Sequence, residues 1–179
     1  MAVMVALLRG VNVGGKNALP MADLRAIATG CGHTAVRTYI QSGNLVFDSA
    51  TTSTAEVAEQ LQSAIAAATK VHPDVVVRTR DELAAVVAGN PFLKRRAEPG
   101  HLHVVFLTGD QPAKVPIADL RPYAPEEATA HGRELYLFLP NGVGRSKLAA
   151  DLTRSKGRPG TMRNWATVTK LLALADDAP

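Results

Sequence analysis

The first 80 residues contain four short β-rich runs and two helical stripes, and the order of these elements limits the folds that the chain can adopt. The β-rich runs are residues 3–8, 36–41, 45–47 and 74–78. Helical spacing of apolar residues lies between the first and second runs and between the third and fourth. The order strand, helix, strand, strand, helix, strand is that of a ferredoxin-like (βαββαβ) unit. The sequence therefore predicts an α+β protein with a ferredoxin-like N-terminal half.

Turn and capping residues separate these elements. Pro20 stands where a first helical turn begins, and the helical pattern ends at Gly30. The run 42–44, Ser-Gly-Asn, tolerates the positive φ of a tight hairpin between two strands. Ser53 and Glu56 have the spacing of a capping box, which predicts that the second helix begins there.

The second half carries similar elements in a looser order. A second capping box, Thr79 with Glu82, predicts another helix. Further along, the sequence predicts a strand at 102–107, a hairpin about Gly132 and helical pieces near 145–153 and 163–175. We therefore expect a ferredoxin-like domain at 1–80 and a second, smaller α+β subdomain at 81–179 with a basic C-terminal helical segment.

Composition indicates a folded chain with an aliphatic core. Of the 179 residues, 46% are hydrophobic and 20% are charged, fractions that exclude disordered and collagen-like chains. Only 4% are aromatic, so the core must be aliphatic. The single cysteine, Cys31, cannot form an intramolecular disulfide. We see no targeting signal and no apolar run near the roughly 20 residues that a membrane-spanning helix needs. These features predict a cytoplasmic protein with no membrane segment.

Five strings along the chain resemble one known family in their order and spacing: LLRGVNVGGKN, VRTYIQSGNLVF, NPF, LPNGVGRSKL and RNWATVTKLL. The family is the bacterial domain-of-unknown-function family DUF1697, and the resemblance covers nearly the whole chain. It implies a two-part α+β protein with a ferredoxin-like N-terminal half. It implies no activity, so no catalytic or ligand-binding residue is carried over from the family.

The loop at 10–17, GVNVGGKN, is the first candidate ligand site. Its spacing matches the phosphate-binding pattern G-x-x-x-x-G-K, but Asn17 replaces the Ser or Thr that would bind magnesium. The predicted helix also starts several residues after Lys16 rather than at it, which argues against a Walker-type nucleotidase. An anion-binding nest of glycine amides beside Lys16 stays open.

Strand direction places a second loop beside the first. Strands one and two of a ferredoxin-like unit point the same way, so loop 10–17 and hairpin 41–44 should share one end of the sheet, which we call the N-terminal rim. The connection after the second helix, with Lys70 and His72, should reach the same end. The predicted ligand-binding residues of the rim are Asn12, Gly14, Gly15, Lys16, Asn17, Gln41, Ser42 and Asn44.

The second candidate site lies in the basic segment 141–170. This segment holds seven Lys or Arg residues against Asp151 alone, a local charge of +6 in a chain whose net charge is +4. Such an excess suits phosphate-bearing partners, although a solvated helical face is the alternative explanation. Arg145, Ser146 and Lys147 stand near a predicted helix start, where amides and cations together favour an anion.

Other chemistries lack a complete set of residues. His101 and His103 alternate on one predicted strand without a third metal ligand. Cys31 has no activating partner in the sequence, and Phe47 is the one aromatic residue on the strands where an RNA-recognition motif stacks bases. We therefore predict no metal and no cofactor, and the sequence identifies no catalytic residue.

Taken together, these residues predict binding of an anionic, phosphate-bearing ligand, either a nucleotide or a nucleic acid. Two alternatives stay open. One is an enzyme that acts on a small polar metabolite at the N-terminal rim. The other is a homo-oligomeric adaptor, such as a homodimer, whose sheet packs against a second copy.

Overall fold

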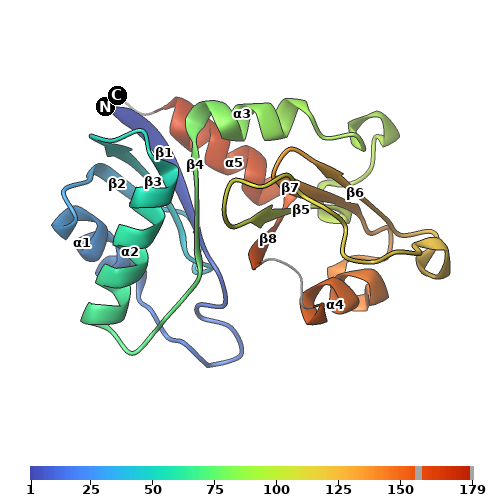
Figure 1. Cartoon of the computed structure of the whole chain (residues 1–179), viewed down its shortest axis with the longest axis horizontal. Coiled ribbons are helices and arrows are strands. Elements are labelled where there is room, and N and C mark those ends of the chain that lie inside the picture. Colours follow the sequence, from blue (N-terminus) through green and yellow to red (C-terminus); the bar gives the residue numbers. More distant parts are fainter. Residues whose placement is uncertain (156–158, 178–179) are drawn as a thin grey trace. The chain divides into compact units, whose positions relative to one another are not determined.

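Two compact units make up the chain in the computed structural model, which describes residues 1–155 and 159–177. One unit consists of Met1–Ala85 with Lys170–Pro179, and the other of Val86–Thr169. The boundaries fall inside helices α3 (Arg80–Ala88) and α5 (Trp165–Asp176). The described residues form a mixed α+β structure with two four-stranded antiparallel sheets and five α-helices (Figure 1).

The first unit follows the predicted order of elements. In chain order these are β1 (Ala2–Leu8), α1 (Met21–Gly30), β2 (Thr34–Thr38), β3 (Asn44–Ser49), α2 (Thr54–Ala68) and β4 (Val75–Thr79). The strands lie in the order β2-β3-β1-β4, and each neighbouring pair is antiparallel. Because β1 and β2 both run antiparallel to β3, the connections that follow them leave from the same end of the sheet. Figure 1 shows α1 and α2 on one face of this sheet.

The core of this unit is aliphatic, as composition predicts. Alternate β1 residues, Met4, Ala6 and Leu8, belong to one cluster with the buried stripes of α1 and α2. Helical spacing brings Leu61 and Ile65 of α2 into that cluster. The period of two along β1 and of three to four along the helices therefore gives one continuous core.

Helix starts follow the two capping boxes, although only one box is reciprocal. Ser53 Oγ accepts a hydrogen bond from the Glu56 amide at 3.3 Å, but the Glu56 carboxylate bonds the Thr51 hydroxyl instead of the Ser53 amide. At α3 the Thr79 amide donates to Glu82 Oε2 at 2.8 Å and the Glu82 amide donates to Thr79 Oγ1 at 3.1 Å. Both helices begin where the pattern predicts.

The end of α5 belongs to the first unit through two arginine contacts. Arg37 on β2 donates to the carbonyl oxygen of Leu174 at 2.5 Å. Arg80 donates to Asp176 at 2.6 Å and also forms an ion pair with Asp81. Residues distant in sequence thus complete the unit that begins with β1.

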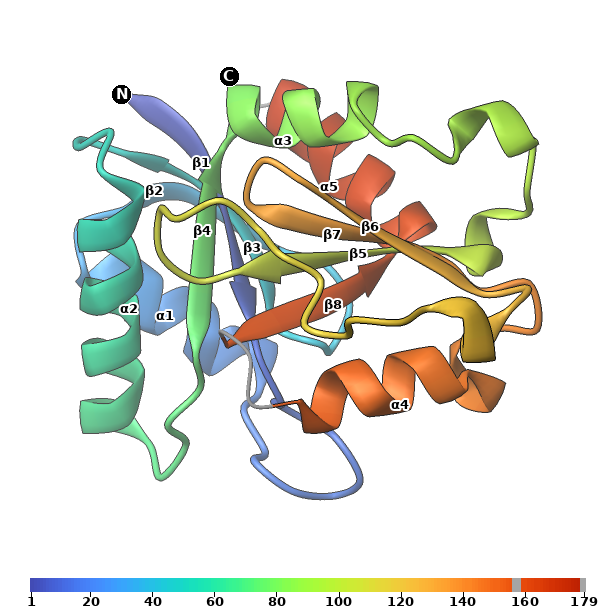
Figure 2. The same ribbon diagram turned by 45° about the vertical axis from the view of Figure 1, so that its right-hand side comes forward.

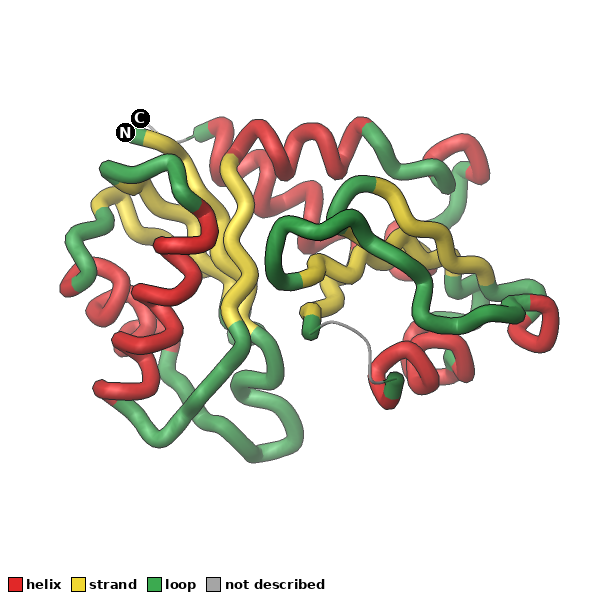
Figure 3. The backbone as a smooth tube through the Cα atoms, viewed as in Figure 1, coloured by secondary structure: helices red, strands yellow, loops and turns green. Residues whose placement is uncertain are grey.

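The second unit contains a second antiparallel sheet. Its strands are β5 (Leu102–Leu107), β6 (Glu127–His131), β7 (Glu134–Phe138) and β8 (Gly160–Asn164), and they lie in the order β6-β7-β5-β8. Figure 2 labels these strands, and Figure 3 draws them in yellow. The sequence predicts β5 and the β6–β7 hairpin correctly. Helix α4 (Lys147–Arg154) contributes Leu148 and Ala149 to a buried cluster with Leu137 of β7 and with Leu139, which follows that strand.

Strand β8 corrects the sequence-based prediction, which began the last helix at residue 163. The segment GTMRN has weak intrinsic β preference, and its pairing with β5 decides its conformation. A Cβ atom on Gly160 would lie 2.7 Å from the Phe106 carbonyl oxygen, so only glycine allows this close approach. Helix α5 then begins at Trp165, where Asn164 Oδ1 caps it by accepting from the Thr167 amide at 2.8 Å.

The described helices are short. The longest of them, α2, has 15 residues. In the part of the chain that the structure describes, no helix combines the length and apolarity needed to cross a membrane.

Substituting Gly43 tests how closely the β2–β3 connection approaches β1. Its φ is +78°, and an added Cβ would lie 2.6 Å from Val11 Cγ2 and 2.8 Å from Leu8 Cβ. We expect Gly43→Ala to lower the free energy of unfolding by about 2–4 kcal/mol, because steric overlap adds to backbone strain. Gly14→Ala, at φ +57° with no atom within 4 Å, should cost only about 1 kcal/mol. Urea unfolding measures both, and equal losses would contradict the close approach.

The buried imidazole of His33 should make stability depend on pH. His33 is 4% exposed, its ring centroid lies 4.5 Å from that of Phe47, and burial lowers its pKa below the ordinary 6.5. The unfolded chain then binds the proton more readily, so stability is full above the ordinary pKa and falls as pH decreases through it. We expect His33→Phe to reduce the slope of the stability profile between about pH 7.5 and 5.5, and the buried His103 to keep part of it. A matched change at exposed His72, His72→Gln, should leave the profile as in the parent chain.

Candidate ligand-binding rim

Hydrogen bonds join the connections that meet at one end of the first sheet. The Leu8 amide donates to the Gly43 carbonyl at 2.9 Å, and Asn12 Nδ2 donates to the Gln41 carbonyl at 2.7 Å. The Arg9 amide donates to the Asp74 carbonyl at 2.9 Å, which adds the connection before β4. Figure 2 shows the loop after β1 projecting beyond this end of the sheet. The two parts of the N-terminal rim therefore lie together, as strand direction predicts.

Residues 12–17 form a small hairpin rather than a phosphate-binding loop. The Asn12 amide donates to the Asn17 carbonyl and the Lys16 amide to the Val13 carbonyl, each at 3.0 Å. Gly14 and Gly15 have φ of +57° and +72°, the pattern of a type I′ turn. Turn geometry thus accounts for the glycines, and the Lys16 amide is occupied within the hairpin.

Asparagine side chains hold the rim in place. Asn12 Oδ1 accepts from the Leu19 amide at 2.8 Å, while its Nδ2 donates to the Leu19 and Gln41 carbonyls. Asn17 Nδ2 donates to the Gly10 carbonyl at 2.9 Å. Asn44 is fully buried and donates to the Tyr39 carbonyl and the Ser42 hydroxyl. The side-chain amides of these three predicted ligand residues therefore form hydrogen bonds with backbone and hydroxyl groups of the rim itself.

Lys16 is the exposed cation of the rim. It stands beside the turn of the hairpin and forms no ion pair within the described residues. Gln41 is also exposed, and Ser42 is half-buried. Arg9, which the sequence analysis did not select, pairs with Asp74 at 3.5 Å beside the rim, and Lys70 is exposed on the same connection as Asp74.

Two apolar side chains are exposed next to these polar groups. Val13 is 63% exposed and Ile40 is 50% exposed. Ile40 has a φ of +50°, which costs free energy for a β-branched residue. Sequence pattern gives no signal for this strain, because Tyr39 and Ile40 read as part of a strand that in fact ends at Thr38.

The second candidate site has an internal carboxylate at its helix start. Ser146 caps α4, its Oγ accepting from the Ala149 amide at 2.8 Å. The Leu148 amide donates to Glu126 Oε2 at 2.9 Å, and Glu126 is 8% exposed. An anion from the chain itself therefore occupies the position that an external phosphate would take. Arg145 and Lys147 are exposed there, with Lys147 Nζ 5.8 Å from the Tyr123 ring.

Three of the basic residues that the structure describes in segment 141–170 are paired, buried or assigned to the other unit. Arg154 forms an ion pair with Asp151. Arg163 is 8% exposed, and burial lowers its pKa to about 10. Lys170 belongs to the first unit, whereas Lys156 and Arg158 lie outside the described residues. Within the described part of the second unit, the segment presents two exposed cations that form no ion pair, Arg145 and Lys147.

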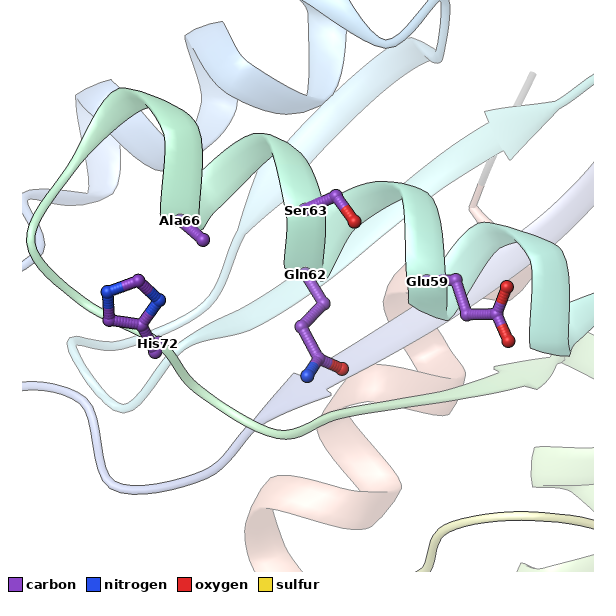
Figure 4. Close-up of a pocket in the computed structure, with 5 residues that line it drawn as sticks. All are labelled: Glu59, Gln62, Ser63, Ala66 and His72. Carbon is purple, nitrogen blue, oxygen red and sulfur yellow. The ribbon is translucent and has the colours of Figure 1, made fainter.

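A shallow depression of about 420 Å³ lies along the exposed side of α2. Figure 4 shows Glu59, Gln62, Ser63 and Ala66 on the helix and His72 on the connection that follows it. The carboxylate and the imidazole stand at different ends of this row of side chains. The depression therefore presents separate polar groups rather than an acid–base pair.

Metal and thiol chemistry find no support in the geometry. Within residues 1–155 and 159–177, no three His, Cys, Asp or Glu side chains are grouped as metal ligands. His103 is 5% exposed, and burial, followed by the charge of His101, lowers its pKa. Burial raises the pKa of the Cys31 thiol, which disfavours the reactive thiolate.

Asn12→Gly isolates the contribution of the Asn12 side chain. Glycine accepts the φ of +54° at this position, so the substitution removes the three side-chain hydrogen bonds without adding strain. We expect a loss of about 1–3 kcal/mol in the free energy of unfolding and faster hydrogen exchange at the Leu19 amide. Asn17→Gly, which removes one side-chain bond, serves as the control and should have a smaller effect. Unchanged exchange at Leu19 would show that Asn12 does not anchor the hairpin.

Comparisons with known proteins identify the family of the chain and find a solved structure with a similar fold. No curated protein matches the chain. The solved structure of the conserved bacterial protein SP0830 from Streptococcus pneumoniae is similar over 99% of each chain, with a TM-score of 0.77 and 22% identity, a likeness that concerns the fold alone. The family model described as "Protein of unknown function (DUF1697)" matches residues 1–136. The match confirms the resemblance seen in the sequence, and the chain belongs to the DUF1697 family.

Proposed function

We propose that the chain binds a compact phosphate-bearing ligand, of nucleotide size, at the N-terminal rim of a ferredoxin-like first unit. The order of elements and the strand order β2-β3-β1-β4 support the ferredoxin-like assignment. Open faces and edges of such sheets, with the loops at one end, are common places for ligands. Phosphate-bearing metabolites are abundant in the cytoplasm, the location we propose for this chain.

One observation carries the proposal: Lys16 is an exposed, unpaired ammonium on a hairpin that the rest of the rim holds rigidly. The two strand-like bonds of the hairpin and the three side-chain bonds of Asn12 restrict its motion. A cation fixed before binding loses less conformational entropy when it meets an anion. Left-handed residues and an exposed, glycine-rich turn bury little apolar surface, so the segment contributes more to recognition than to the core.

In this proposal some rim residues contact the ligand, and others hold the loops in position. Lys16 neutralises phosphate charge, and the side chains of Gln41 and Ser42 orient the ligand through hydrogen bonds. Asn12, Asn17 and Asn44 keep the loops in position. Gly14 and Gly15 supply the turn that carries Lys16.

The described charges favour a compact anion over a nucleic-acid strand. A polymer needs a stripe of cations, each of which releases counterions from the backbone. The rim offers Lys16 with Lys70 nearby, and Arg9 is already paired with Asp74. Arg145 and Lys147, beside Ser146 on the second unit, are proposed as a separate and weaker anion contact, because Glu126 occupies the helix amide there.

Titration of the chain with ADP and with pyrophosphate tests the proposal. At about 50 mM salt we expect binding by calorimetry, and Lys16→Ala should weaken it about tenfold, the cost of one charge-assisted contact. The unfolding free energy of this variant should stay within about 0.5 kcal/mol of the parent, because Lys16 is exposed. Lys94→Ala, which removes an exposed lysine of the second unit, is the matched control and should bind as the parent does.

Two outcomes would overturn the assignment. Absence of binding to both probes at millimolar concentration removes the ligand class, and equal affinity of Lys16→Ala removes the site. A labelled single-stranded RNA is the third arm, measured at about 50 and 200 mM salt. Tight RNA binding that falls steeply with salt would replace the compact ligand by a nucleic acid.

A further inference from the structure

Strand β6 has a free hydrogen-bonding edge. It is the outermost strand of its sheet, and its hairpin with β7 closes at the pair His131–Glu134 around a two-residue turn. Residues 127, 129 and 131 therefore direct their backbone groups to β7, and alternation directs those of Ala128 and Ala130 outward. Within the part of the chain that the structure describes, these outward N–H and C=O groups have no hydrogen-bond partner.

This edge lacks three features that often prevent pairing with another strand. Proteins protect exposed edges with proline, lysine or a β-bulge. At the β2 edge of the first sheet, the register shifts between Thr34 and Arg37, and Ala35 has a φ of +51°. The β6 strand, Glu-Ala-Thr-Ala-His, contains neither proline nor lysine and keeps an unbroken register with β7.

We propose that β6 pairs antiparallel with β6 of a second copy of this chain, about a twofold axis at Thr129. In this register Ala128 exchanges two hydrogen bonds with Ala130 of the partner subunit, and the symmetry repeats the exchange. All the outward backbone groups of both alanines are then satisfied. The β6-containing sheet of one copy then continues into the same sheet of the second copy.

Hydrogen-bond complementarity between side chains favours this register and this partner. Glu127 stands opposite His131 of the partner subunit, a carboxylate against an imidazole, while small alanines flank the axis symmetrically. Glu127 also pairs with Arg95 of its own chain, and a carboxylate has lone pairs for both donors. Shifting the register by two residues removes both the Glu–His match and part of the hydrogen bonding.

The contact is small, so the dimer should be weak. One strand edge with alanine and threonine side chains buries less than the roughly 1,200 Å² of a stable interface. We expect a dissociation constant between about 100 μM and 1 mM, which sedimentation equilibrium at chain concentrations up to about 1 mM detects. A chain that stays monomeric over this range would overturn the proposal.

Two edge substitutions test which surface pairs. Ala130→Pro removes an outward N–H without touching the ladder to β7, and Thr129→Lys places two like charges together at the axis. Each should weaken the dimer at least about tenfold, with folding checked by circular dichroism. Thr34→Lys, on the bulged β2 edge, is the matched control and should leave the dimer unchanged. Loss of the dimer in the control, but not in folded β6 variants, would move the interface elsewhere.

Disulfide trapping tests the register even if one edge variant fails to fold. In a Cys31→Ala background, Thr129→Cys places two thiols at a non-hydrogen-bonded pair, where Cα atoms about 4.5 Å apart permit a disulfide. Ala128→Cys places its thiols away from the axis. Under a mild oxidant we expect the first variant to form a covalent dimer at least about tenfold faster than the second. Equal rates would contradict pairing at Thr129.

Discussion

Antiparallel pairing of β1 with both β3 and β4 is the constraint on which the first unit depends. Continuous registers on both sides make β1 the central strand and fix which ends of the neighbouring strands lie together. The connection after β1, the connection before β3 and the connection before β4 must therefore meet at one end. Backbone bonds from Leu8 to Gly43 and from Arg9 to Asp74 close that end. The rim is thus a consequence of strand direction, and the candidate site inherits its position from the core.

Rigidity at the rim comes from polar groups rather than from apolar burial. Asn12 adopts a left-handed backbone conformation and satisfies three backbone groups at once, and Asn44 does similar work in full burial. Asparagine suits both tasks, because it tolerates positive φ and carries a donor and an acceptor on one short side chain. These bonds tie the protruding hairpin to the rest of the rim, while the side chain of Lys16 is open to solvent. For the function that we propose, this bonding lowers the entropy that the Lys16 backbone loses when a ligand binds.

Sequence pattern was most informative where local chemistry decides the structure. The Thr79–Glu82 box, the Pro20 start of α1 and the continuous aliphatic run of β1 each predict an element whose bounds agree closely with the structure. Strand β8 shows the opposite case, because its conformation follows from pairing with β5 and from space around Gly160, neither of which is local. At the rim, strand direction predicted which loops meet. The sequence did not reveal that Asn12, Asn17 and Asn44 are used internally, since a free and a bonded amide look the same in a string of letters.

The basic segment 141–170 shows why the formal charge of a segment differs from the charge that it presents to solvent. Segment 141–170 carries a formal charge of +6, but Arg163 is buried, Arg154 forms an ion pair with Asp151, and Lys170 belongs to the other unit. Glu126, distant in sequence from α4, adds a carboxylate at the helix start where an external anion was expected. A helix N-terminus stabilises any anion placed beside it. A carboxylate that the fold holds there has a much higher effective concentration than a free ligand, so it occupies the site. Lys16 keeps its charge available for the converse reason, because no acidic side chain among the described residues is placed to pair with it.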